Sequence, residues 1–118
     1  MTAPEARQFA ASWVQAWNSH KLDEIMSHYG SNIVLTSPVA AKLLDEPSGT
    51  IMGLEALRNY FKRGLDEYPK LTFELLDVMW GLSSIVLYYT NQNGTKSGEF
   101  MEIDASGKVV RVIANYNR

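Results

Sequence analysis

The chain has 118 residues, a formal net charge of −2, no cysteine and a hydrophobic fraction of 46%. This length predicts one domain over residues 1–118 that can bury a core without help from a metal or a disulfide. The absence of cysteine excludes thiol nucleophiles and thiolate metal sites, and the small net charge argues against a nucleic-acid-binding protein. The N-terminus lacks the apolar core of a signal peptide, and no apolar run reaches the ~20 residues that span a bilayer. We therefore expect a cytoplasmic protein that binds neither nucleic acid nor membrane.

The first half of the chain is predicted to be mainly helical. Thr2 and Glu5 match a capping box, and Phe9, Trp13 and Trp17 then recur every four residues on one helix face. Similar spacing predicts two further helices, at residues 22–29 and 54–68. A short apolar run at residues 33–37 predicts a strand that stops before a proline. We expect a loop over residues 39–50 and a minor strand around residues 50–52.

From residue 71 onward the pattern changes to strands. We expect strands at residues 71–80, 84–92, 96–104 and 108–116, separated by turn signals. Helices first and a strand meander afterwards predict an α+β fold. Three helices from the N-terminal half of the chain would pack on one face of an antiparallel sheet.

Asn93-Gly94 is the strongest short hairpin signal in the sequence. If these residues form a two-residue turn, Tyr88 pairs with Glu99 and Val86 pairs with Met101. Directly paired residues lie on the same face of a sheet, so Glu99 would share a face with this group. A loop longer by one residue would break this assignment.

Glu99 is the candidate functional carboxylate. In a strand it shares a face with Met101 and Ile103, because side chains alternate. One interpretation is an acid whose pKa is raised by apolar walls and which acts as an acid or base. The other is a carboxylate at the rim of the sheet, solvated or bonded to a nearby Trp or Tyr.

Several local motifs occur in the order found in one known superfamily. They are Trp13-Val14-x-Ala16-x-Asn18, Leu22-Asp23-x-Ile25, Ser37-Pro38-Val39 and Gly107-Lys108-Val109-Val110. Over nearly its whole length the chain resembles the nuclear transport factor 2-like superfamily, in its ketosteroid isomerase-like and polyketide cyclase-like branch. The resemblance implies a cone-shaped fold, in which a curved sheet and the helices on its concave face enclose a deep, mostly apolar pocket.

The resemblance also assigns positions in that pocket. The isomerases place a general-base aspartate where this chain has Ser37, a tyrosine where it has Trp13, and a protonated aspartic acid where it has Glu99. Serine has no useful basicity near neutral pH without a partner base, and an indole N–H matches a developing enolate less well than a phenol. We therefore expect the pocket but not conventional ketosteroid isomerisation.

The predicted site combines Glu99, as a tentative catalytic group, with a wall of pocket residues. We expect that wall to contain Trp13, Trp17, Leu35, Ser37, Tyr60, Phe61, Val86, Tyr88, Met101, Val112, Ala114 and Tyr116. The tryptophans could instead fill the core, the serine could cap a turn, and Tyr88 could only pack across strands. The expected ligand is a small apolar molecule with a carbonyl or hydroxyl group. We expect no cofactor, and no metal site because paired histidines and cysteines are absent.

The outer face of the sheet is expected to be apolar. It would carry Ile85, Leu87, Tyr89, Phe100, Val109 and Ile113, which predicts a homodimer through the sheet. Three functions stay open. The chain could be a small-molecule-binding domain, an isomerase, cyclase or hydrolase that uses Glu99, or a protein-interaction module that uses the outer sheet face.

Overall fold

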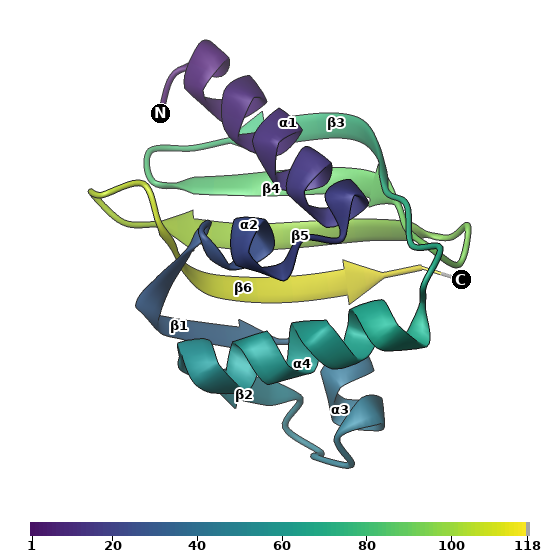
Figure 1. The fold of residues 1–118 in the computed structure, drawn as a ribbon. Helices are drawn as coiled ribbons and strands as arrows, with labels where there is room; N and C mark the ends of the chain where they lie inside the picture. The colour runs from purple at the N-terminus through teal and green to yellow at the C-terminus, as the bar shows by residue number, and fades with distance from the viewer. Residues whose placement is uncertain (118) are drawn as a thin grey trace.

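The computed structural model describes residues 1–117, in which the helices lie on one side of a curved six-stranded sheet (Figure 1). The helices are α1 (Ala3–Ser19), α2 (Leu22–Met26), α3 (Pro38–Leu43) and α4 (Leu54–Glu67). The strands are β1 (Tyr29–Thr36), β2 (Thr50–Met52), β3 (Glu74–Trp80), β4 (Ser84–Thr90), β5 (Lys96–Ile103) and β6 (Val109–Tyr116). They are ordered β2-β1-β6-β5-β4-β3 across the sheet. The predicted α+β class is confirmed.

Helix α1 begins at the predicted capping box and buries one face. The hydroxyl of Thr2 accepts from the Glu5 N–H, and the Glu5 carboxylate accepts from the Thr2 N–H at 2.7 Å. The buried positions recur at helical spacing and face the sheet: Ala6, Ala10, Trp13, Ala16 and Trp17. This face of α1 forms one wall of the protein interior.

A short helix, α3, replaces part of the predicted loop over residues 39–50. The Ser37 hydroxyl accepts a hydrogen bond from the Val39 N–H at 3.1 Å and so caps the helix. Pro38 occupies the first turn, where its missing N–H removes no helical hydrogen bond. The prediction treated Pro38 only as the end of a strand, although Ser-Pro is also a helix start.

The sequence analysis predicted an antiparallel sheet, but one pair of neighbouring strands is parallel. Strands β1 and β6 run parallel, with Leu35 opposite Val112, whereas the other neighbouring pairs are antiparallel. Most of the chain separates β1 from β6, so no hairpin turn dictates their relative direction.

The predicted register of the β4–β5 hairpin is wrong by one residue. Thr90 pairs with Lys96, and the connecting loop spans residues 91–95. The Asn91 side chain holds this longer loop, because its oxygen accepts from the Asn93 N–H at 3.0 Å and from the Thr95 hydroxyl at 3.1 Å. Gly94 still adopts a positive φ of 76°, but inside a five-residue loop rather than a two-residue turn.

This register exchanges the two faces of strand β4. Leu87, not Tyr88, lies opposite Glu99, and Ile85 lies opposite Met101. Three predicted outer-face residues of β4, Ile85, Leu87 and Tyr89, are therefore buried in the core. Val109 of β6 is also buried, at an irregularity in the β5–β6 pairing. The other two, Phe100 and Ile113, are only partly buried and lie on the convex face.

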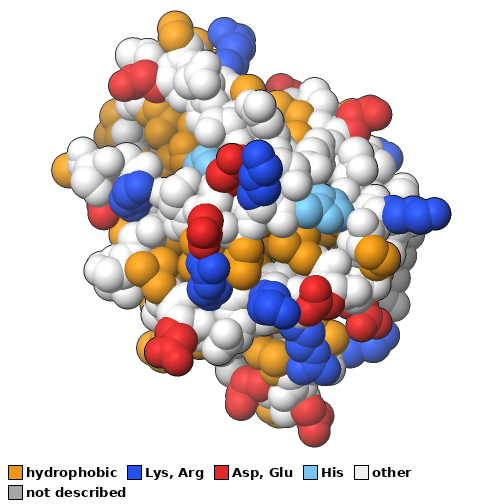
Figure 2. All heavy atoms as spheres, viewed as in Figure 1, with side chains coloured by type: hydrophobic (Ala, Val, Ile, Leu, Met, Phe, Trp, Pro, Cys, Tyr) orange, Lys and Arg blue, Asp and Glu red, His pale blue; other side chains and the backbone are white. Residues whose placement is uncertain are grey.

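None of the helices in residues 1–117 is both long and apolar enough to cross a membrane. On the helix-bearing face, acidic and basic side chains are interspersed, with apolar side chains showing between the helices (Figure 2).

Candidate functional site

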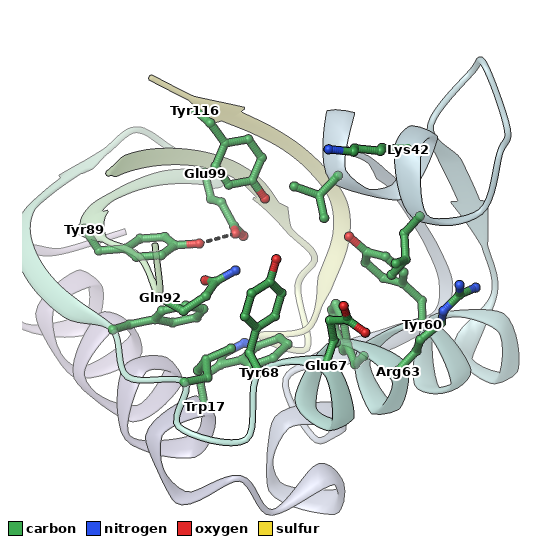
Figure 3. Close-up of a pocket in the computed structure, with 16 residues that line it drawn as sticks. Trp17, Lys42, Tyr60, Arg63, Glu67, Tyr68, Tyr89, Gln92, Glu99 and Tyr116 are labelled. Atoms are coloured by element: carbon green, nitrogen blue, oxygen red, sulfur yellow. Dashed lines mark hydrogen bonds between the residues drawn. The ribbon is translucent and has the colours of Figure 1, made fainter. Parts of the chain in front are cut away.

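A cavity of about 450 Å³ opens between the concave face of the sheet and helix α4 (Figure 3). Helices α1 and α3, the segment that follows α4, and strands β4, β5 and β6 complete its wall. The volume falls within the range of small-molecule sites. Seven of the cavity's sixteen lining residues are aromatic: Trp17, Tyr60, Phe61, Tyr68, Phe73, Tyr89 and Tyr116.

A smaller chamber of about 50 Å³ lies beside this cavity, against the sheet. The two share part of their lining, namely Trp17, Tyr60, Phe61, Glu99 and Tyr116. The chamber adds Tyr29, Leu35, Ser37 and Ala114 from strand β1, the start of α3 and strand β6. Glu99 therefore borders both spaces.

Glu99 is buried and paired with a tyrosine. Burial alternates along β5, which places Glu99 on the same buried face as Ser97 and Met101. The Tyr89 hydroxyl donates to the Glu99 carboxylate at 2.5 Å (Figure 3). Burial raises the pKa of Glu99 from 4.5 to about 7, although the hydrogen bond from Tyr89 favours the charged form and lowers it. A carboxyl with this pKa has both a protonated and a charged form near neutral pH.

Tyr60, Tyr89 and Tyr116, around Glu99, keep their phenol protons at neutral pH and can donate hydrogen bonds. Burial, and then the charge of Glu99, raise the pKa of Tyr89 and of Tyr116 well above their usual value. Burial also raises the pKa of Tyr60 to about 12. In Figure 3 the hydroxyl groups of Tyr60, Tyr68 and Tyr116 point into the same space as the Glu99 carboxyl. A ligand oxygen placed there would meet several hydroxyl groups.

The two tryptophans of α1 have different roles. Trp13 is buried in the core, donates its N–H to the Tyr29 hydroxyl at 3.0 Å and stacks on Phe73. It does not line the cavity or the chamber described above. Trp17 lines both, and its buried N–H has no hydrogen-bond partner among the described residues. The resemblance pointed to the tryptophan that fills the core.

The structure brings most of the predicted wall together with Glu99. Around the two spaces it places Trp17, Leu35, Ser37, Tyr60, Phe61, Ala114 and Tyr116. Met101 and Val112 face the same side of the sheet but are fully buried in the core. Val86 and Tyr88 were wrongly placed: they face the convex side, where Tyr88 is 39% exposed, because of the register difference.

Several lining residues were not predicted. They are Val39, Lys42, Leu43, Arg63, Gly64, Glu67, Tyr68, Leu71, Phe73, Tyr89 and Gln92. Tyr89 would have followed from a hairpin register shifted by one residue from the predicted one. Gly64 lies four residues after Tyr60 on the same helix face, so the predicted position of Tyr60 could have indicated Gly64. The remaining positions depend on how α3 and the segment after α4 fold back over the sheet.

Ser37 takes the structural role that the sequence analysis left open. Its hydroxyl caps α3, and it lies 3.5 Å from the Tyr116 hydroxyl at the chamber wall. The histidines lie elsewhere: His20 contacts the Leu71 carbonyl at 2.7 Å and His28 contacts the Ser12 hydroxyl at 3.1 Å. No described cluster of histidine and carboxylate side chains could hold a metal ion. Within residues 1–117, the titratable carboxyl between cavity and chamber is Glu99.

Comparison with known proteins places this geometry in a family. Residues 10–115 match the model of the SnoaL-like domain. A SnoaL-like protein of unknown function from Burkholderia thailandensis is 32% identical, with a TM-score of 0.96 over 99% of this chain and 98% of that one. A search of curated proteins gave no match.

More distant structures share the fold alone. A candidate isomerase of the SnoaL-like family from Agrobacterium tumefaciens is 10% identical, with a TM-score of 0.78 over 98% of this chain and 99% of that one. A candidate hydroxylase, AclR from Streptomyces galilaeus, is 20% identical, with a TM-score of 0.74 over 98% of this chain and 81% of that one. The family model and the Burkholderia structure show that this chain belongs to the SnoaL-like domain family.

Proposed function

We propose that the chain binds a small, mostly apolar molecule whose carbonyl or hydroxyl oxygen lies beside Glu99. The observation that carries the proposal is a buried carboxyl group at the inner end of an aromatic-walled cavity. Ligand sites combine apolar and aromatic walls with a few convergent polar groups, which fix the orientation of the ligand. Glu99 and the hydroxyl groups around it are that polar minority.

The unpartnered N–H of Trp17 supports a polar ligand atom in this region. An unsatisfied buried donor costs on the order of 1–3 kcal/mol. Trp17 borders the same chamber as Glu99 and Tyr29. An acceptor oxygen that reaches this N–H on binding would recover part of that cost.

Acid–base catalysis by Glu99 is the second candidate function. Its support is the pKa of Glu99, which burial raises to about 7, the range in which a carboxyl group both gives and takes a proton. Conventional ketosteroid isomerisation is not supported, because Ser37 caps a helix and Trp13 points to Tyr29 in the core.

Binding can be tested with an apolar fluorescent probe, N-phenyl-1-naphthylamine. A Cβ built on Gly64 meets no atom within 4 Å, and Gly64 lines the cavity, so the side chain of Gly64→Leu starts in open space at the cavity wall. Asn59→Leu adds the same side chain at an exposed position of the same helix and is the matched control. We expect Gly64→Leu to abolish the fluorescence gain and Asn59→Leu to keep it. Equal binding by both variants would place the probe elsewhere and contradict the proposal.

Catalysis can be tested by hydrogen–deuterium exchange into 2-tetralone, an apolar enolisable ketone. We expect the protein to accelerate exchange at the carbon next to the carbonyl in D₂O, followed by NMR. Glu99→Gln should return the rate to that of buffer, because the amide cannot accept the proton. Exchange that survives this substitution would exclude Glu99 as the base but would leave ligand binding intact.

We also propose that the convex sheet face forms a homodimer interface. Met79, Val86, Phe100 and Ile113 are directly paired across four strands and make one apolar row. A protein-interaction function would use the same row. Light scattering coupled to size exclusion should give a dimer for the native chain and a monomer for Phe100→Asp. A native monomer would contradict the dimer and leave the row free for another partner.

A further inference from the structure

Lys42 stands at the mouth of the cavity, on the last turn of α3. In Figure 3 its ammonium group extends toward Tyr116, across the entrance from α4. Lys42 also lines a neighbouring groove of about 480 Å³, which shares Val39, Tyr68, Gln92 and Tyr116 with the cavity. Apart from Pro38, the rest of the groove wall is polar, formed by Asn91, Asn93, Thr95 and Asn117. Lys42 therefore marks the boundary between an aromatic interior and a polar exterior.

The ammonium group of Lys42 has no carboxylate partner among the described residues. The ion pairs found there are Lys21–Glu24, Arg58–Asp23 and Lys62–Asp66. The capped helix α3 holds Lys42 at the entrance, because Ser37 fixes its first turn. A cation held there without a partner favours an anionic ligand group.

Two other charged residues of the lining differ from Lys42, Arg63 in the direction of its side chain and Glu67 in the sign of its charge. Arg63 also lines the cavity, but Figure 3 shows its guanidinium directed away from the labelled phenol groups. Glu67, one turn later on α4, is an acidic rim residue that opposes an anion. An anionic group placed deep among the aromatic rings would lose its hydration without a counter-charge. The charge pattern thus places an anion at the Lys42 side of the mouth.

We propose that the ligand carries an anionic group, which lies beside the ammonium of Lys42 while its apolar part fills the cavity. This inference rests on the proposed binding function and narrows its ligand class to amphiphilic anions. Carboxylate, sulfonate and phosphate groups share the chemistry that Lys42 recognises. The oxygen beside Glu99 is then at the opposite end of the ligand from the charge.

Two probes with one ring system test the inference. 1-Anilinonaphthalene-8-sulfonate is N-phenyl-1-naphthylamine with an added sulfonate, so the difference between their responses reports on the charge. We expect Lys42→Gln to weaken binding of the sulfonate about three- to fivefold, as for an exposed ion pair, and to change the neutral probe less than about twofold. Lys42→Arg should keep the response. High salt should also reduce the contribution of Lys42 to sulfonate binding.

Controls separate the mouth charge from general effects. Lys62→Gln removes a cation from α4 that pairs with Asp66 and does not line the cavity, so neither probe should respond. Glu67→Gln removes the opposing charge and should strengthen sulfonate binding by about twofold. Gly64→Leu should abolish binding of both probes, because it fills the cavity. Circular dichroism of each variant checks the fold.

The outcomes distinguish the inference from the proposed function. A selective loss of sulfonate binding in Lys42→Gln supports both. Equal responses of the two probes to Lys42→Gln, with binding still abolished by Gly64→Leu, overturn the anionic ligand and leave the binding function standing. Sulfonate binding that Gly64→Leu does not abolish lies outside the cavity and also overturns the inference. Failure of the native chain to bind either probe overturns the binding function, and the inference with it.

Discussion

Replacing Glu99 by glutamine should make the protein more stable at alkaline pH. Burial raises the pKa of Glu99 from 4.5 to about 7, so between these two values the native state retains a proton that the unfolded chain has released. The free energy of unfolding therefore falls as pH rises through this window. Each pH unit corresponds to about 1.4 kcal/mol, so the whole window is worth about 3 kcal/mol.

Glutamine removes this cost because it stays neutral, and its amide oxygen still accepts the hydrogen bond from Tyr89. At pH 8 we expect Glu99→Gln to exceed the native chain by up to about 3 kcal/mol in urea unfolding, and at pH 4.5 to match it closely. Glu102→Gln is the matched control, because it makes the same substitution on the same strand with the side chain on the opposite face. A Glu99→Gln variant no more stable than the native chain at pH 8 would refute the conclusion that burial disfavours the charged form of Glu99.

Three further changes test single contacts. Tyr89→Phe removes the hydrogen bond that favours the charged form of Glu99, so an NMR titration should give Glu99 a pKa above 7; a lower value would contradict this pairing. Ser37→Ala removes the α3 cap and should cost about 1 kcal/mol in thermal or urea unfolding, whereas no loss would show that the cap is dispensable. Gly64→Ala should stabilise the chain by about 0.5–1 kcal/mol, because it improves helix propensity where the added Cβ meets no atom within 4 Å; destabilisation would place an atom there.

Local chemistry in the sequence was sufficient to predict most helices and strands. The Thr2–Glu5 box starts α1 as predicted, since capping depends on residues only three positions apart. The recurrence of Trp13 and Trp17 predicted a buried helix face, which the structure confirms. The four strands predicted after residue 71 are also present, each shorter than predicted by one to three residues. These features need no knowledge of distant partners.

The sheet register and the cavity wall depended on tertiary structure. Asn93-Gly94 correctly predicted a hairpin, but the Asn91 side chain holds a five-residue loop and so turns Tyr89, rather than Tyr88, toward Glu99. Because side chains alternate along a strand, this one-residue difference moved every β4 residue to the other face. Lys42 lies at the entrance on a short helix that begins at the Ser37 cap and that the sequence analysis did not predict. Periodicity predicts which residues are buried, whereas contacts between distant segments decide which of them meet around Glu99.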